Sequence, residues 1–356
     1  MSSVEGHLTP EVVLAALSKV EDPELHVDLV SLGMIKELAV EGERVSFAIE
    51  LTTPACPLRN KIEADARRAV EALPGVADVT IRMTSNVPHD RQASGFVQHQ
   101  IRNTVAIASG KGGVGKTTVA VNVAITLAQS GACVGLLDAD IYGPNVPIMV
   151  GVDVAPKPKG NKLTPAEAYG VRLMSIGFLV QPGQPLVWRG PMLHSAIRQF
   201  IEDVNWGELD YLIVDLPPGT GDAQLSLSQI IPLSGGVIVT LPQKVSLEDA
   251  RRGLELFRVM DIPILGVVEN MSYLELPDGS QMDVFGQGGG EELARQAGVP
   301  LIGSIPLDPL VREGGDNGVP IVISHPESPA AKALKGIAES LAAKVSVLVL
   351  DKSRDI

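Results

Sequence analysis

The segment Gly110-Lys-Gly-Gly-Val-Gly-Lys-Thr-Thr118 constrains the fold of this chain more than any other feature. The aliphatic run Val105–Ala108 precedes it, and the helix-like run Lys116–Gln129 follows it. Its glycines permit a tight turn in which backbone N–H groups converge at the start of a helix. The spacing G-x-x-x-x-G-K-[ST] between a strand and a helix therefore predicts a phosphate-binding loop in an α/β domain.

The side chains of this loop have the chemistry that a nucleotide needs. We expect Lys116 to neutralise the β- and γ-phosphates of ATP, Thr117 to ligate Mg²⁺ and Thr118 to contact the α-phosphate. A chance glycine-rich turn is the alternative, which the flanking strand and helix disfavour. The predicted nucleotide-binding residues of the loop are Gly110, Lys111, Gly112, Gly113, Val114, Gly115, Lys116, Thr117 and Thr118.

A second lysine, Lys111, lies inside the loop. Such a lysine is typical of the deviant Walker A subgroup of P-loop ATPases, which this loop resembles. The resemblance implies a nucleotide-sandwiched homodimer in which Lys111 reaches the partner's nucleotide. There it would stabilise charge on the transferring phosphoryl group, as an arginine finger does. The alternative is a solvated lysine on a loop.

Carboxylates end two of the aliphatic runs. Asp138 and Asp140 end the run Leu136–Asp140, and Asp215 ends Tyr211–Asp215. Ligands bind at the carboxyl ends of parallel strands, so we expect these carboxylates near the phosphates. Asp140 is the candidate to orient the attacking water, and Asp215 is the candidate Mg²⁺ residue of a Walker B strand. Each could instead be a turn or N-cap residue, a role that suits Asp138.

Two further segments could contact the nucleotide. The glycine-bearing loop Pro217–Asp222 follows the Walker B strand and could respond to the γ-phosphate. Asn270 ends the run Gly266–Asn270, where its side-chain amide could pair with the adenine edge. The alternative for Asn270 is a turn asparagine.

From residue 103 onward, aliphatic runs alternate with stretches of helix length. This alternation predicts a mostly parallel sheet flanked by helices on both faces. The pattern Ser246-Leu-Glu-Asp249 predicts the start of one helix by a capping box. The expected strands are Val105–Ala108, Cys133–Leu137, Leu212–Val214, Gly236–Leu241, Ile264–Val268 and Leu301–Ile305.

Residues 1–85 predict a separate small α/β domain, and the chain length of 356 residues also favours two domains. Thr9, Pro10 and Glu11 are typical of a helix start. The polar residues 86–102 predict a linker to an ATPase domain over 103–356. Helices are expected at Val12–Val20 and Pro57–Leu73, with strands at Met34–Val40, Val45–Leu51 and Val76–Met83.

Composition excludes several classes of function. The net charge of −13 disfavours nucleic-acid binding. No apolar stretch approaches the roughly 20 residues that span a bilayer, and the first residues lack the pattern of a signal peptide. The two cysteines, Cys56 and Cys133, form no disulfide framework. We therefore expect a cytoplasmic protein without membrane or nucleic-acid partners.

The two cysteines lie in different contexts. Cys133 lies in an apolar run, which predicts a buried strand residue. Cys56 precedes Pro57 at the expected start of a helix, where the helix N-terminus would lower the pKa of the thiol. Cys56 is therefore a candidate metal-binding or reactive thiolate, and a packing residue at a turn is the alternative.

Residues 100–345 resemble the Mrp-type iron–sulfur carrier ATPases, relatives of MinD and the nitrogenase iron protein. The resemblance is carried by Gly110–Thr118, Asp138–Asn145, Trp188–Pro191, Asp215–Asp222, Val268–Met271, Phe285–Gly290 and Ile305–Asp308. The N-terminal part resembles the PaaD/SufT-like domain through Asp22–Leu25, Asp28–Gly33 and Leu51–Pro57. The resemblance implies an ATP-hydrolysing dimer that transfers iron–sulfur clusters to apoproteins, with iron–sulfur assembly factors as partners.

One feature departs from that family. Many members carry a Cys-x-x-Cys between the segments that correspond to Val268–Met271 and Phe285–Gly290, where two chains hold one cluster with four thiolates. Here Ser272–Val284 contains no cysteine, and none follows Cys133. An ATP-switched scaffold without its own cluster is therefore a second hypothesis. A positioning ATPase like MinD or ParA is a third, disfavoured because the helix expected at Ala330–Lys344 leads into no basic, membrane-binding face.

Overall fold

The computed structural model describes residues 8–90, 100–152, 158, 162–179 and 190–354. The chain divides into two compact units, one of residues 1–88 with 346–356 and one of residues 89–345. The expected ATPase domain, 103–356, differs at its end, because residues 346–356 group by contact with the N-terminal unit. Most of the expected linker, residues 91–99, lies outside the described residues.

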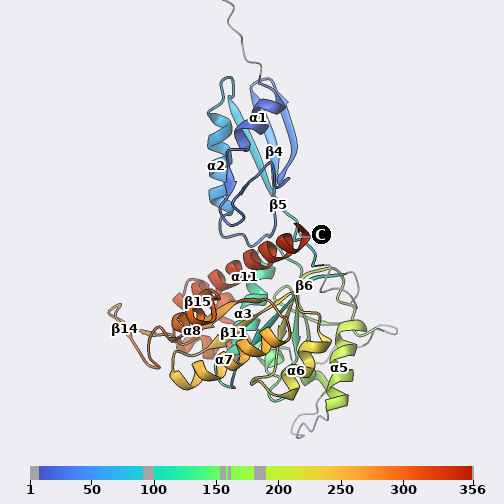
Figure 1. The fold of residues 1–356 in the computed structure, drawn as a ribbon, viewed down its shortest axis with the longest axis vertical. Coiled ribbons are helices and arrows are strands. Elements are labelled where there is room, and N and C mark those ends of the chain that lie inside the picture. The colour runs from blue at the N-terminus through green and yellow to red at the C-terminus, as the bar shows by residue number, and fades with distance from the viewer. Residues whose placement is uncertain (1–7, 91–99, 153–157, 159–161, 180–189, 355–356) are drawn as a thin grey trace, which may run out of the picture. The chain divides into compact units, whose positions relative to one another are not determined.

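The first unit is a three-stranded sheet with two helices (Figure 1). Strand β4 pairs antiparallel with β3 and parallel with β5. Apolar side chains of all these elements form one core, which includes Leu17, Phe47, Ile49 and Ile62. The elements are α1 (Pro10–Leu17), β1 (Glu21–Asp22), β2 (Val27–Asp28), β3 (Ile35–Glu41), β4 (Arg44–Leu51), α2 (Arg59–Glu71) and β5 (Asp78–Ser85).

The second unit contains an eight-stranded sheet in the order β15-β12-β11-β6-β10-β7-β9-β8. All neighbouring strands pair in parallel except β8, which is antiparallel to β9. This confirms the predicted α/β class. The strands are β6 (Ile101–Ala108), β7 (Val134–Asp138), β8 (Ala166–Ala168), β9 (Val171–Ser175), β10 (Leu209–Asp215), β11 (Gly235–Thr240), β12 (Ile264–Glu269) and β15 (Leu301–Ser304).

Helices cover both faces of this sheet. The connection from β6 through α3 to β7 runs along the sheet in one direction, and the connection from β11 through α7 to β12 runs in the opposite direction. Because such crossovers are right-handed, α3 and α7 lie on opposite faces of the sheet. Figure 1 shows α5, α6 and α7 in front of the sheet. The helices are α3 (Lys116–Gln129), α4 (Val146–Met149), η1 (Ile176–Leu179), α5 (Gly190–Glu202), α6 (Asp222–Ile230), α7 (Lys244–Val259), α8 (Gly289–Ala297), α9 (Pro309–Asp316), α10 (Ile321–Ser324) and α11 (Pro329–Arg354).

Two local expectations are wrong. Helix α7 begins at Lys244 with Gln243 as its N-cap, so Ser246 is a buried residue of the first turn rather than a cap. Cys133 lies just before β7 and is exposed, because the strand's buried run begins only at Val134. The segment between β12 and α8, where the family's cysteine pair would lie, forms a small hairpin of β13 (Leu274–Glu275) and β14 (Gln281–Met282).

Candidate nucleotide-binding site

The glycine-rich loop connects β6 to α3, as predicted. Gly115 is the N-cap of α3 and has a φ of +84°, a left-handed conformation that favours glycine. A Cβ at Gly110 would lie 2.1 Å from the backbone of Asp249, so the loop packs against α7 too closely for any side chain. The glycines of the loop and its packing against α7 therefore both favour this loop conformation.

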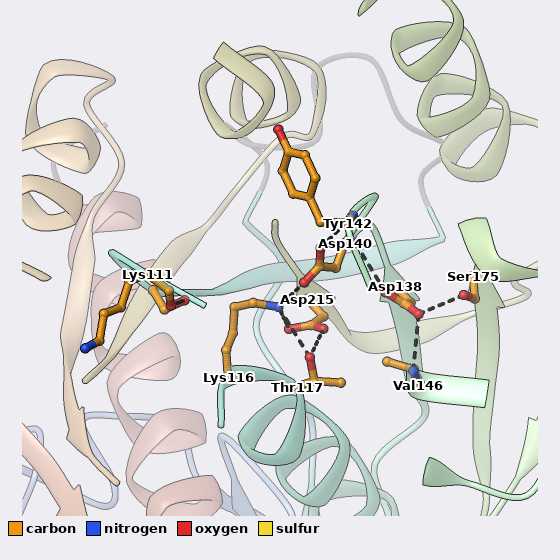
Figure 2. A network of polar contacts seen from close by, with 10 residues as sticks. Lys111, Lys116, Thr117, Asp138, Asp140, Tyr142, Val146, Ser175 and Asp215 are labelled. Carbon is orange, nitrogen blue, oxygen red and sulfur yellow. Dashed lines mark hydrogen bonds and ion pairs between the residues drawn. The ribbon is translucent and has the colours of Figure 1, made fainter. Parts of the chain in front are cut away.

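The carboxyl ends of β7 and β10 bring two carboxylates to Lys116 (Figure 2). The Lys116 Nζ lies 2.5 Å from Asp215 Oδ1 and 3.3 Å from Asp140 Oδ2. The Thr117 hydroxyl donates to the other oxygen of Asp215 at 2.7 Å. Thus the residues predicted to bind phosphate, to hold Mg²⁺ and to orient water lie together at the carboxyl ends of β7 and β10.

Burial and charge oppose each other in this cluster. Burial alone would lower the pKa of Lys116, but the negative charges of Asp215 and Asp140 outweigh it and raise that pKa. Burial raises the pKa of Asp215, and Lys116 opposes the rise. A charged lysine therefore offsets part of the cost of burying carboxylates here.

Asp138 lies beside Asp215 in the sheet register but has different partners. Its carboxylate accepts hydrogen bonds from the backbone of Asp140 and Val146 and from the Ser175 hydroxyl. Burial and then the charge of Asp215 raise the pKa of Asp138 to about 8. The sequence pattern does not predict Ser175 at this site, because its position depends on the pairing of β9 with β7.

Lys111 lies apart from this cluster. Figure 2 shows its side chain directed away from Lys116 and from the carboxylates. It is half-buried, and no ion pair to it occurs within 4.0 Å among the described residues. Within its own chain, Lys111 therefore does not contact the residues that would surround the γ-phosphate.

The loop after the Walker B strand lies against the glycine-rich loop. The Gly219 amide donates to the Ser109 carbonyl at 2.9 Å. A Cβ at Gly112 would lie 3.9 Å from the Pro218 ring. The expected γ-phosphate response of this loop stays a prediction, and the motif Trp188–Pro191 falls largely outside the described residues.

Asn270 follows β12 and contacts the glycine-rich loop directly. Its Nδ2 donates to the Val114 carbonyl at 2.8 Å. A Cβ at Gly115 would lie 2.1 Å from that Nδ2, so the glycine makes room for the amide. The amide thus supports the loop, and its contact with adenine stays a prediction.

A cavity of about 550 Å³ opens beside Asn270. It begins at Thr118, next to the glycine-rich loop, and extends toward α9. This volume lies within the range of small-molecule sites. Its lining includes Thr118, Asn145, Met149, Asn270, Leu307, Asp308 and Arg312.

Cys56 in the first unit differs from its expectation. Helix α2 begins at Arg59 with Leu58 as its N-cap, so Pro57 is not the first helical residue. Burial, together with smaller contributions from the nearby carboxylates Glu24 and Asp22, raises the pKa of the Cys56 thiol to about 11. The predicted lowering of the thiol pKa is therefore wrong. Among the described residues, no group of three or more His, Cys, Asp or Glu side chains could hold a metal ion.

The glycine-rich loop, the strand-end carboxylates and the sheet order define a P-loop nucleotide-binding protein. Comparison with known proteins gives a narrower class. Residues 100–342 match the family described as ParA, NUBPL iron-transfer P-loop NTPase. Residues 10–83 match the iron–sulfur cluster assembly protein family.

Individual relatives agree with these matches. The iron–sulfur cluster carrier protein of Synechocystis is 56% identical over 96% of this chain and 99% of its own length. That of Deinococcus radiodurans is 52% identical over 96% of this chain and 97% of its own. A nucleotide-binding protein from Archaeoglobus fulgidus, solved with ADP, is 36% identical, with a TM-score of 0.57 over 65% of this chain and 90% of that one.

The chain therefore belongs to the iron-transfer P-loop NTPases, together with the iron–sulfur cluster carrier proteins. This confirms the family predicted from the sequence motifs. Among the described residues, no helix combines the length and apolar character that crossing a membrane requires.

Proposed function

We propose that this protein is a Mg²⁺-dependent ATPase that acts as a homodimer and transfers iron–sulfur clusters to apoproteins. The observation that carries the proposal is the convergence of Lys116, Thr117 and Asp215 in a chain 56% identical to an iron–sulfur cluster carrier protein. The family match over both units supports the same function.

The residues at the sheet edge fit the chemistry of ATP hydrolysis. The Thr117 hydroxyl and the Asp215 carboxylate are hard oxygen donors, as Mg²⁺ prefers, and would hold the ion. When bound, the ion would neutralise phosphate charge. Lys116 would bind the β- and γ-phosphates, and the carboxylate of Asp140 would accept a hydrogen bond from the attacking water.

Lys111 would complete the site of the partner chain. Its ammonium group is directed away from its own carboxylate cluster, which favours action in trans over action in cis (Figure 2). A cation that arrives only when two nucleotide-bound chains meet would couple hydrolysis to dimer formation.

The cargo is best tested by anaerobic reconstitution with iron and sulfide. We expect the wild-type protein to bind a cluster and to activate an apo-iron–sulfur enzyme. The variant Cys56→Ser is expected to reduce cluster content, with Cys133→Ser as the matched control. The carrier function should be rejected if the wild-type protein binds no cluster and activates no apoprotein.

A second candidate function is an ATP-switched scaffold for iron–sulfur assembly. It is favoured by the absence of cysteine after Cys133 and by the raised pKa of Cys56. In that case ATP would change the binding of assembly partners while reconstitution leaves no cluster on this chain. A stoichiometric cluster that is lost with Cys56→Ser would exclude the scaffold.

A further inference from the structure

Asp138 differs from the other carboxylates of the nucleotide site. Lys116 pairs with Asp140 and with Asp215, whereas no ion pair of Asp138 occurs within the described part of the chain. Asp138 is nevertheless 0% exposed. A carboxylate in such a place needs hydrogen bonds to offset the loss of water.

Those hydrogen bonds come from both ends of one loop and from a neighbouring strand. Asp138 Oδ1 accepts from the Asp140 amide at 3.2 Å. Its Oδ2 accepts from the Val146 amide at 3.3 Å and from the Ser175 hydroxyl at 2.7 Å. We call these residues, Asp138, Asp140, Val146 and Ser175, the Asp138 cluster (Figure 2).

Ser175 extends the cluster to a further segment. It is the register partner of Asp138 in the pairing of β7 with β9. Its Oγ also accepts from the Gly177 amide at 2.9 Å, at the start of η1. A Cβ at Gly177 would lie 3.3 Å from the Pro144 carbonyl, so η1 lies against the same loop.

We propose that Asp138 and Ser175 are positioning residues that fix the loop 139–146 and thereby hold the Asp140 carboxylate beside Lys116. The geometry supports action through the backbone, because both loop-end amides donate to Asp138. Asp140 then lies with its Oδ2 3.3 Å from Lys116 Nζ. The consequence for turnover rests on the proposed ATP hydrolysis, whereas the fixing of the loop does not.

The first measurement is amide hydrogen exchange of the nucleotide-free protein. Asp138→Asn replaces one accepting oxygen by an NH₂ group, and Ser175→Ala removes the hydroxyl. Both should speed exchange in the peptide 139–146 by about tenfold, with α3 unchanged. Ser175→Thr keeps a hydroxyl and should restore the wild-type rate.

The second measurement is steady-state ATP hydrolysis with nucleotide affinity. Misplacing Asp140 should lower kcat about tenfold or more in Asp138→Asn and Ser175→Ala, with the KM for ATP and the Mg²⁺ requirement nearly unchanged. The matched control is Ser234→Ala. Ser234 is also buried and accepts from the Thr104 amide, at the opposite end of the sheet strands.

The outcomes separate the two proposals. Wild-type protein without ATP turnover would refute the proposed hydrolysis, while exchange in 139–146 would still test the loop. Wild-type exchange in this peptide in both variants would overturn the positioning role. So would a change confined to ATP affinity or Mg²⁺ requirement, which would mean that Asp138 contacts the ligand.

Discussion

The Lys116 ammonium group and the Asp215 carboxylate form an ion pair of 2.5 Å in which both partners are buried. Residue Asp140 shares the same cation at 3.3 Å. The one lysine therefore balances two carboxylates that the ends of β7 and β10 bring together. Its charge therefore stabilises the two buried carboxylates, and in the proposed function the same charge would bind phosphate.

Removing this charge should affect both properties. In Lys116→Ala, ATP hydrolysis should fall below detection, because no cation remains for the β- and γ-phosphates. The two carboxylates also lose their partner, and leaving a buried charge uncompensated costs about 3–5 kcal/mol. Thermal unfolding with and without nucleotide, together with an ATPase assay, measures both effects.

The control for this variant is Lys116→Arg, which keeps the charge. The melting temperature of Lys116→Arg should be closer to the wild-type value than the melting temperature of Lys116→Ala is. Turnover of Lys116→Arg should still be strongly reduced, because guanidinium and ammonium geometries differ. Equal melting temperatures for the wild type and Lys116→Ala would contradict the structural part of the prediction.

Lys111→Ala should separate binding from turnover. Because its side chain is directed away from its own cluster, ATP affinity should change less than about threefold, whereas kcat should fall about a hundredfold or more, as expected for a lost arginine finger. Nucleotide titration and single-turnover hydrolysis provide these values.

Mixing two inactive variants tests whether Lys111 acts in trans. A chain with Lys111→Ala retains a complete nucleotide site, and a chain with Lys116→Ala retains its Lys111. If Lys111 acts across the dimer, the mixture should regain activity that neither variant has alone. Absence of recovery in a mixture shown to form mixed dimers would refute the assignment.

The sequence predicted the nucleotide loop well because its determinants are local. Helix α3 begins at Lys116 and ends at Gln129, the predicted residues, since glycine spacing and helix pattern lie in one short segment. Asp140 and Asp215 meet Lys116 as the rule on strand ends predicts. The same strand–loop–helix pattern therefore predicts both the α/β fold and the position of the nucleotide-binding residues.

Most of the expectations that were wrong or incomplete depend on contacts between distant segments. Ser175 reaches Asp138 only because β9 pairs with β7, and the short strands β8 and β9 were not expected. The pattern at Ser246 resembled a cap, but the helix begins two residues earlier. The pKa of Cys56 depends on burial and on Asp22 and Glu24, about thirty residues away, which local helix rules do not include.

The reactivity of Cys56 should depend steeply on pH. Burial raises the pKa of this thiol from 9.0 to about 11, so the thiolate fraction at neutral pH is about 100-fold smaller than for an unperturbed thiol. The alkylation rate should rise about tenfold per pH unit and reach no plateau below about pH 11. Iodoacetamide labelling followed by mass spectrometry of the Cys56 peptide measures this rate.

The background Cys133→Ser removes the exposed second thiol, so labelling in that variant reports on Cys56 alone. Fast labelling at pH 7 with a plateau below pH 8 would show a lowered pKa instead. It would restore the reactive-thiolate hypothesis for the first unit. Slow labelling would mean that a metal must displace a tightly held proton to bind there.

Asn270→Ala should weaken phosphate binding. The variant removes the donor to the Val114 carbonyl and leaves space beside Gly115, so the glycine-rich loop loses support. Loss of one hydrogen bond of about 1 kcal/mol corresponds to roughly a fivefold rise in Kd. The rise should appear for ADP, GDP and tripolyphosphate alike, because loop support does not depend on the base.

Asn145→Ala is the matched control, since Asn145 lines the same cavity but is exposed and makes no capping hydrogen bond. It should leave tripolyphosphate affinity unchanged. Isothermal titration with the three ligands distinguishes the two roles of Asn270. If Asn270→Ala weakens ADP but leaves tripolyphosphate affinity at the wild-type value, the amide acts on adenine alone, and its hydrogen bond to Val114 contributes nothing to phosphate binding.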